Sequence, residues 1–257
     1  MNTAREIADA IRSLPKSERE ELIDRLGTTL PELFSADYSN QTESPPAGQR
    51  INELWHSRDE GAWKGALERY FIFVKPSNVD LERGLEALSL DMIKSLDSEG
   101  WYDFLYEKYF PWKYTAPNRL ATTRKNLAKY LQSHSLDELA TVKQLLLSFP
   151  RHDVREGLRI ASTIRGLGVA GASGLLALMY PNEFGTVDQF AVKALLGVDG
   201  LPQREFILHM KPQGLTVEDG VIIIGVMRDK ATANNRRFNT AEWTPRKIDK
   251  ILWTYGR

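Results

Sequence analysis

The chain has 257 residues, of which 42% are hydrophobic, and its 34 basic residues balance 34 acidic ones. This length and apolar content allow one large or two small domains with a buried core, and they exclude global disorder. Because cysteine is absent, disulfides, thiolate zinc sites and cysteine-ligated iron–sulfur clusters are excluded. No apolar run approaches a membrane span and the first residues do not resemble a signal peptide, so we expect a cytoplasmic protein with no membrane partner.

The charges are unevenly distributed along the chain. Residues 1–110 contain 13 Lys and Arg against 21 Asp and Glu, a net charge of −8. Residues 111–257 contain 21 against 13, a net charge of +8. The basic half favours a nucleic-acid partner, and solvated helix faces are the alternative interpretation.

Residues 1–34 are predicted to form an N-terminal helical hairpin. Pro15 separates two short amphipathic segments, and Ser17 with Glu20 forms a capping-box pattern for the second one. The hairpin therefore reads as an appendage to the rest of the chain.

A linker separates this hairpin from the main domain. Residues 35–50 are polar and contain a Pro-Pro pair, which is typical of a linker or a long surface loop. Residues 51–257 form the main domain, where helical periodicity predicts an all-α fold. Helices are predicted over 60–73, 80–97, 99–109, 118–133, 136–149, 152–164, 170–180, 188–196, 216–235 and 245–255. Residues suited to an N-cap or a first helical turn are Asp80, Ser135, Thr216 and Pro245.

A glycine turn and a following carboxylate form the most informative motif. Gly166 and Gly168 flank Leu167 between an amphipathic segment and an apolar one, and Asp188 follows Gly166 by 22 positions. Glycine lets a backbone approach a phosphate closely, and the amides from Gly168 to Ala170 open a helix whose positive end favours anions. A plain tight turn between packed helices is the alternative. Asp188 suits a helix N-cap, where an ionised carboxylate can stabilise a cationic transition state or activate a water.

This motif resembles that of a known enzyme family. It runs Ile164-Arg-Gly-Leu-Gly-Val-Ala-Gly-Ala172 and then Thr186-Val-Asp-Gln-Phe190. Both the pattern and the spacing resemble the helix-hairpin-helix–Gly/Pro–Asp superfamily of DNA glycosylases. The resemblance implies a two-lobed all-α fold, a partner of double-stranded DNA, and removal of a flipped-out base to leave an abasic site.

The resemblance also implies roles for individual residues. Asp188 would be the catalytic aspartate at the mouth of a base pocket. No side-chain metal site is expected, although a monovalent cation, Na⁺ or K⁺, would sit on backbone carbonyls of the turn. Family members that cleave the abasic strand carry a lysine where this chain has Ala170, so we expect a monofunctional enzyme. The backbone amides of Gly166, Gly168 and Ala170 would hold a phosphate, while Leu167 would fill the hydrophobic side of the turn. The residues of the turn expected to bind DNA are Arg165, Gly166, Leu167, Gly168, Val169 and Ala170.

Aromatic and basic residues are interleaved after residue 100. Aromatic residues crowd positions 101–114, and residues 111–135 contain five basic residues and no acidic one. Such segments stack bases and hold a nucleic-acid backbone, while core packing of one helix is the alternative. The DNA-binding candidates here are Lys113, Asn118, Arg119, Arg124 and Lys125. The pocket or wedge candidates are Trp101, Tyr102, Trp112, Tyr114 and Gln189.

The sequence leaves the substrate and the class of function open. The altered base could be a damaged one, in repair, or a hypermodified base of phage DNA, in defence. A non-catalytic helix-hairpin-helix DNA-binding module, with Asp188 only as an N-cap, is the alternative to an enzyme. A helical scaffold for protein partners is a third interpretation, and we expect a monomer.

Overall fold

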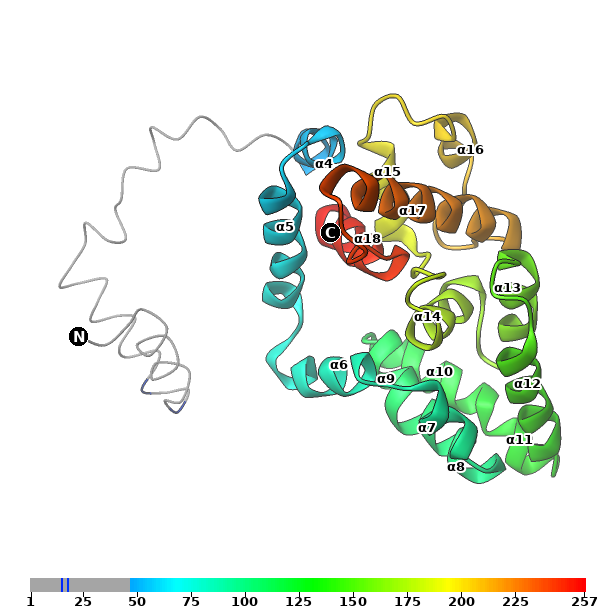
Figure 1. The fold of residues 1–257 in the computed structure, drawn as a ribbon. Helices are drawn as coiled ribbons and strands as arrows, with labels where there is room; N and C mark the ends of the chain where they lie inside the picture. The colour runs from blue at the N-terminus through cyan, green and yellow to red at the C-terminus, as the bar shows by residue number, and fades with distance from the viewer. Residues whose placement is uncertain (1–14, 16–17, 19–46) are drawn as a thin grey trace. The chain divides into compact units, whose positions relative to one another are not determined.

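Helices form every regular element in the part of the chain that the structure describes (Figure 1). This computed structural model describes residues 47–257 together with Pro15 and Glu18. Apart from those two residues, the predicted hairpin and most of the predicted linker lie outside the described residues. No strand occurs within 47–257, so the expected all-α class is confirmed.

The bounds of the helices follow in chain order. Up to residue 132 they are α4 (Ala47–His56), α5 (Glu60–Phe73), the 3₁₀ turn η2 (Pro76–Asn78), α6 (Val79–Glu86), α7 (Leu90–Ser95), α8 (Ser98–Asp103), the π-helical η3 (Phe104–Tyr109), α9 (Phe110–Lys113), α10 (Pro117–Leu127) and α11 (Lys129–Gln132). They continue as α12 (Leu136–Ser148), α13 (Val154–Ser162), α14 (Val169–Met179), α15 (Gln189–Leu196), α16 (Arg204–Leu208), α17 (Val217–Phe238) and α18 (Pro245–Gly256). The helices α4, α9 and α16 and the turn η2 lie outside the predicted helices, and the start of α4, residues 47–50, occupies the end of the predicted linker.

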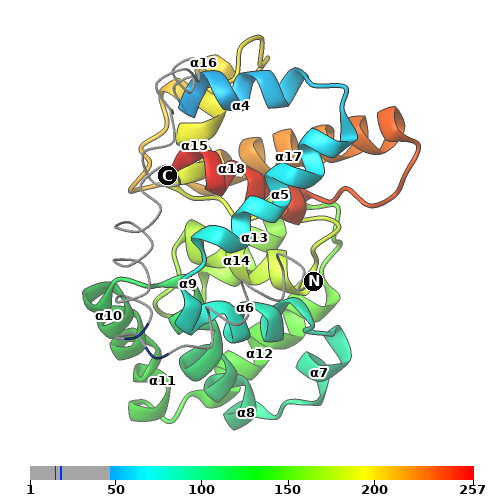
Figure 2. The same cartoon turned by 90° about the vertical axis from the view of Figure 1, so that its left-hand side faces the viewer.

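Helix α18 is central to the packing of the site. It contacts α4, α5, α15 and α17 (Figure 2). Helices α13 and α14 contact each other across the predicted glycine turn, and α14 also contacts α17 and α18. The loop from α14 to α15 therefore starts and ends on helices that pack against α18.

Side-chain caps fix several helix starts. Asp59 accepts a 2.8 Å hydrogen bond from the amide of Gly61 and begins α5 where the sequence predicts it. Thr216 and Asp219 form a capping box at the start of α17, and Pro245 lies in the first turn of α18, as predicted. The sequence pattern is reliable where a cap and an apolar face coincide.

Two predicted helices are divided in the structure. The segment 80–97 forms α6 and α7, because the Ser89 side chain accepts an amide hydrogen bond and starts a new helix. Asp80 is not an N-cap; it lies in the first turn of α6, which Asn78 precedes. The segment 118–133 is likewise divided into α10 and α11.

The helix through the aromatic segment changes its hydrogen-bond pattern before Pro111. In η3 the amide of Phe110 donates to the carbonyl of Leu105, five residues back. Proline has no N–H and cannot close the next α-helical bond, and a π turn inserts one extra residue at this point. The extra residue turns Trp112 and Lys113 around the helix axis relative to an uninterrupted α-helix.

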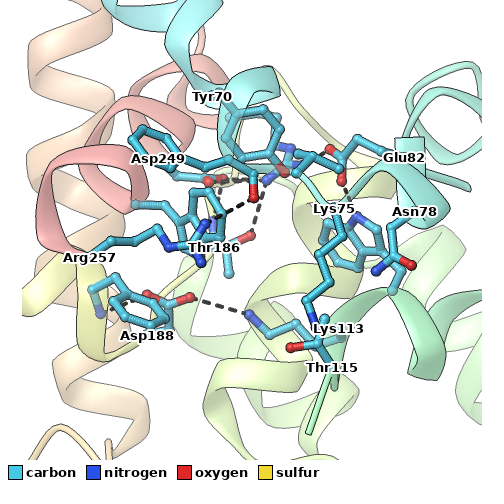
Figure 3. A pocket seen from close by; sticks show the side chains of 16 residues that line it. Tyr70, Lys75, Asn78, Glu82, Lys113, Thr115, Thr186, Asp188, Asp249 and Arg257 are labelled. Atoms are coloured by element: carbon cyan, nitrogen blue, oxygen red, sulfur yellow. Dashed lines mark hydrogen bonds and ion pairs between the residues drawn. The ribbon is translucent and has the colours of Figure 1, made fainter. Parts of the chain in front are cut away.

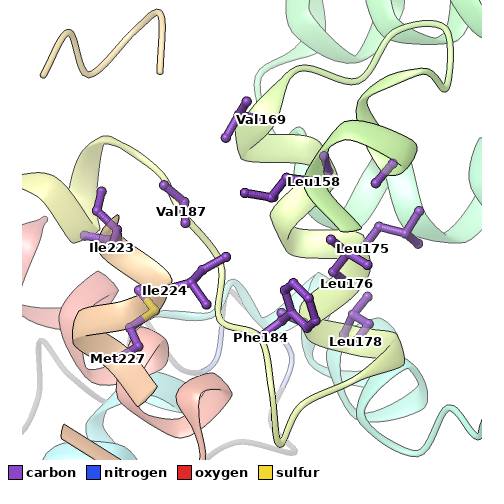
Figure 4. Packing of buried hydrophobic residues seen from close by; sticks show 14 of the residues in the cluster. Leu158, Val169, Leu175, Leu176, Leu178, Phe184, Val187, Ile223, Ile224 and Met227 are labelled. Carbon is purple, nitrogen blue, oxygen red and sulfur yellow. The ribbon is translucent and has the colours of Figure 1, made fainter. Parts of the chain in front are cut away.

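Part of the hydrophobic core lies between α14 and α17, against the loop that joins α14 to α15 (Figure 4). Leu175 and Leu176 on α14 are fully buried, as are Ile223 and Ile224 on α17. Val187 from the loop is also fully buried. Among the described residues, no helix is both long enough and apolar enough to cross a bilayer.

Candidate functional site

The loop that precedes α15 is held by two helices. From α14, the hydroxyl of Ser173 accepts a 2.9 Å hydrogen bond from the amide of Val187. From α18, the carboxylate of Asp249 accepts a 2.7 Å hydrogen bond from the amide of Thr186. Both acceptors are buried. The backbone that presents the next residue, Asp188, is therefore fixed on both sides.

The two carboxylate oxygens of Asp188 have different partners. Oδ1 accepts hydrogen bonds from the amides of Phe190 at 3.0 Å and Ala191 at 3.1 Å, so the residue is the N-cap of α15 as predicted. Oδ2 lies 3.7 Å from Nζ of Lys113 (Figure 3). The side chains of Asp188 and Lys113 are 19% and 10% exposed. Burial lowers the pKa of Lys113, and the charge of Asp188 opposes that shift.

A cavity of about 230 Å³ opens beside this pair (Figure 3). Charged and polar residues that reach it include Lys75, Asn78 and Arg257, along with Lys113 and Asp188. Aromatic rings form part of its wall, those of Tyr70, Phe73, Trp112, Phe190 and Trp253. Flat rings beside hydrogen-bonding groups can stack on a base and bond its edges, although this cavity has more polar groups than most small-molecule sites.

A buried ion network lines the same cavity. Arg246 donates to Glu82 at 3.1 Å and to both oxygens of Asp249 at 3.0 and 3.1 Å. Glu82 also accepts from the indole N–H of Trp112. Burial raises the pKa of Asp249, which the Arg246 charge opposes. Because the network joins α6, α9 and α18, it holds one wall of the cavity against the loop of Asp188.

A second cavity, of about 360 Å³, adjoins the first along the glycine turn. Residues 168–171 at the start of α14 line it, together with Arg119. Lys113, Thr115, Asp188 and Phe190 line both cavities. No side chain caps the start of α14, so its positive end is available to an anion.

The glycine turn itself has the geometry that the motif predicts. Gly166 has a φ of +99°, and a Cβ there would lie 2.8 Å from the carbonyl oxygen of Thr123 on α10. Only glycine fits both requirements without strain. Leu167 is buried beneath the turn. Side-chain contact of Leu167 with DNA is therefore excluded in this conformation.

The predicted aromatic candidates divide into two groups. Trp101 is fully buried and stacks on Phe104, with ring centres 5.4 Å apart, and Tyr102 is buried and stacks on Tyr106 at 5.7 Å. Neither lines either cavity, so assigning them to a pocket or wedge is wrong, and core packing explains them. The remaining candidates line the cavities, Trp112 the first and Tyr114 and Gln189 the second.

The predicted basic candidates also divide. Arg165 pairs with Glu138 at 3.1 Å and stacks over a tyrosine ring, and Arg124 pairs with Glu107 at 3.0 Å and stacks over another. These two guanidinium groups are used inside the protein, because stacking and pairing satisfy them there. The candidates with exposed side chains are Asn118, Arg119 and Lys125.

Several residues of the site carry no motif in the sequence. Tyr70 and Phe73 come from α5, Glu82 from α6, and Arg246 and Asp249 from α18. One sequence signal for the last two is that Arg246 and Asp249 stand three residues apart on a helix face that is otherwise apolar. Charged side chains on such a face are buried only when they are paired, so the pattern indicates a buried ion pair. A run of exposed apolar residues beside the cavity was also missed; Ile72 is 77% exposed.

Comparisons with protein-family models, curated proteins and solved structures gave no match. Among the residues that the structure describes, no group of three or more His, Asp or Glu side chains could hold a metal ion. The monovalent cation at the turn stays a prediction. Two carbonyls of the turn, those of Thr163 and Ile164, accept hydrogen bonds from Tyr130 and Leu167.

Proposed function

We propose that the protein is a DNA N-glycosylase that releases one altered base from double-stranded DNA, with Asp188 as its catalytic carboxylate. One observation carries the proposal. Asp188 lines both an aromatic cavity and the cavity along the uncapped start of α14. A carboxylate between a base site and a phosphate site faces the sugar that joins them.

The aromatic cavity is the proposed site of the flipped base. Base–aromatic stacking contributes ~1–3 kcal/mol per base, and Trp112 and Phe190 are among the walls available for it. The volume of about 230 Å³ lies just below the ~300–1,000 Å³ common for small-molecule sites. This size supports a base with a small alteration as the first choice. A sugar-bearing base of phage DNA, which needs more room, is the second.

The DNA backbone is proposed to follow the second cavity. The amides of Gly168, Val169 and Ala170 would hold a phosphate next to the flipped nucleotide, with Arg119 beside them. On the other cavity, the lining residue Phe73 is 45% exposed, and its neighbour in the sequence, Ile72, is 77% exposed. Apolar side chains beside a base pocket suit insertion into the base stack that flipping leaves open.

The chemistry follows from the position of the Asp188 carboxylate. When the bond between C1′ and the base nitrogen breaks, its electron pair leaves with the base and the sugar becomes cationic. The carboxylate stabilises this charge: Oδ1 is held by the helix, and Oδ2, which faces Lys113 at 3.7 Å, is the oxygen that would meet the sugar. A water then adds to C1′, and the proton it gives up neutralises the departing base. The products are a free base and an abasic sugar.

A non-catalytic DNA-binding module is the second candidate, and one observation favours it. The two amide bonds to Oδ1 give Asp188 a structural role as an N-cap that needs no chemistry. In that case the turn would grip DNA and the aromatic cavity would hold no base.

Base release measured by mass spectrometry separates these candidates. Duplexes carrying alkylated, oxidised, mispaired and sugar-modified bases would be incubated with the wild-type protein and with Asp188→Asn. Release of one free base by wild type alone supports the glycosylase and identifies its substrate class. Binding of every duplex without release from any of them supports the binding module.

A further inference from the structure

Lys113 occupies an unusual position at the junction of the two cavities. Its side chain is nine-tenths buried, and Nζ lies 3.7 Å from Oδ2 of Asp188 (Figure 3). The stem of the lysine crosses α14 at Gly174, where a Cβ would lie 3.2 Å from Cδ of Lys113. A glycine in the helix thus makes room for this side chain.

The amine of Lys113 has one charged partner and otherwise borders the two cavities. An ammonium has three donors, and the charge partner of this one is Asp188, 3.7 Å away. Arg246, by comparison, holds Asp249 at 3.0 Å in a closely bonded pair. Burial lowers the pKa of Lys113, which increases the fraction of free amine. A largely buried amine that lies beside a proposed catalytic carboxylate and borders both cavities is suited to a role as a nucleophile.

We propose that Lys113 is a nucleophile that attacks C1′ of the abasic sugar, so that the protein also cleaves the DNA strand at the abasic site. This inference rests on the proposed glycosylase function. A monofunctional enzyme was expected because Ala170 stands where the resembling family has its lysine. The amine comes instead from α9, where the fold places Lys113 3.7 Å from Asp188.

The reaction is a sequence of ordinary carbonyl steps. The lone pair of the Lys113 amine adds to the aldehyde carbon C1′ of the ring-opened abasic sugar, and loss of water gives a protonated imine. Asp188 removes a proton from C2′, and the electron pair of that C–H bond moves toward the imine. The C3′–O bond then breaks, and its electrons leave with the phosphate of the downstream strand. Water hydrolyses the remaining imine and returns the free lysine, so no oxidant or reductant is needed.

Borohydride trapping on DNA with one preformed abasic site tests the proposal directly. This probe does not require the identity of the excised base, because the base is already absent. Borohydride delivers hydride to the imine carbon and turns it into a stable amine, which joins protein to DNA. We expect a covalent adduct with the wild-type protein and strand cleavage without borohydride. Peptide mass mapping should find the sugar remnant on Lys113.

Two variants make the test specific. Lys113→Gln should lower the adduct yield at least tenfold, even at protein concentrations that saturate its binding to the same abasic duplex. Lys193→Gln is the matched control, because Lys193 lies on α15, is exposed and donates to the backbone carbonyl of Arg257 at 3.2 Å. It should trap like the wild type.

The remaining outcomes overturn the proposal in distinguishable ways. An adduct on another amine, or an unchanged yield in Lys113→Gln, removes Lys113 as the nucleophile. Binding of the abasic duplex without any adduct removes the strand-cleaving activity but leaves the glycosylase intact. Failure of the wild-type protein to bind DNA removes both proposals.

Discussion

The amide of Thr186 donates a 2.7 Å hydrogen bond to Asp249, and this bond joins the loop of Asp188 to helix α18. Asp249 is in turn held by Arg246, whose guanidinium carbon lies 5.3 Å from the ring centre of Trp112 in the cavity wall. One buried arginine thus positions both the loop and the wall. Arg246 and Asp249 therefore position the loop that carries Asp188.

Replacing Arg246 should therefore destabilise the fold. Arg246→Met leaves the carboxylates of Glu82 and Asp249 buried without their cation, and breaking a buried pair in this way costs ~3–5 kcal/mol. The free energy of unfolding, measured by urea denaturation, should fall by this amount. The combined variant Glu82→Gln, Arg246→Met and Asp249→Asn should recover part of the loss, because it removes the unpaired charges. A single-variant loss below ~1 kcal/mol, the size expected of an exposed pair, would contradict a buried network.

Asp188→Asn should separate binding from chemistry. Asparagine caps a helix about as well as aspartate, so α15 and the fold should be retained. The base-release rate should fall by ~10²–10⁴-fold, because an amide carries no charge to stabilise the sugar cation or to accept a proton. Single-turnover base release and fluorescence anisotropy with the same duplex measure the two properties. Equal rates for the two proteins would leave Asp188 only its structural role.

Gly166→Ala should damage the turn. The φ of +99° and the 2.8 Å approach to Thr123 predict a loss of ~1–3 kcal/mol in the free energy of unfolding, together with weaker DNA binding. Gly65→Ala is the control, because Gly65 lies within α5 and a Cβ there meets no atom within 4 Å. That change should stabilise the protein by ~1 kcal/mol, since alanine is the better helix former. Thermal unfolding of both variants would show whether the turn or merely the loss of a glycine matters.

Arg119 and Arg124 should differ in their effect on DNA affinity. Arg119 is exposed and lines the cavity along the turn, whereas Arg124 is bonded to the carbonyl of Tyr106 and to Glu107. Arg119→Ala should weaken binding and reduce the slope of log affinity against log salt by about 1. Arg124→Ala should leave this slope unchanged and lower the melting temperature. A larger salt effect for Arg124 would place the DNA on a different face.

The fold was predictable wherever a cap and an apolar stripe lie close in the sequence. Asp59 and Thr216 each stand directly before a helix whose buried face repeats with the helical period. The segment 80–97 fails this test, because its apolar period continues across Ser89 while the cap there starts a new helix. The hydrophobic period shows which face of a helix is buried, but it does not show where one helix ends and the next begins.

The candidate site was only partly predictable, for a related reason. Gly166 and Asp188 belong to one short motif, so their relation can be read along the chain. Arg246 and Glu82 bond across 164 residues of sequence, and only tertiary packing brings them together. Arg165 is predicted to bind DNA because it stands in the glycine-turn motif, but its charge is paired with Glu138 in the fold. The sequence shows how many charged side chains there are, and only the packing shows which of them are not paired within the protein and can contact DNA.

The pH dependence of trapping should identify the amine that reacts. Lys113 attacks only as the free amine, so the trapping rate on abasic DNA should rise as pH increases through its pKa. Burial lowers that pKa below the ordinary 10.5, while Asp188 and Asp249 raise it and Arg246 lowers it further. The rising limb should therefore lie at lower pH than the titration of an exposed lysine.

Removing the charge at Asp188 should move the rise of the trapping rate to still lower pH. In Asp188→Asn the nearest carboxylate is lost, so the pKa of Lys113 should fall and trapping should rise at lower pH than in the wild type. The imine forms before Asp188 removes the C2′ proton. The rate of borohydride trapping therefore reports the reactivity of the amine alone, even in this variant. Initial trapping rates across a pH series, measured for both proteins on one abasic duplex, give the pH range in which each rate rises. If both rates rise over the same pH range, that of an ordinary lysine, the reacting amine does not face Asp188.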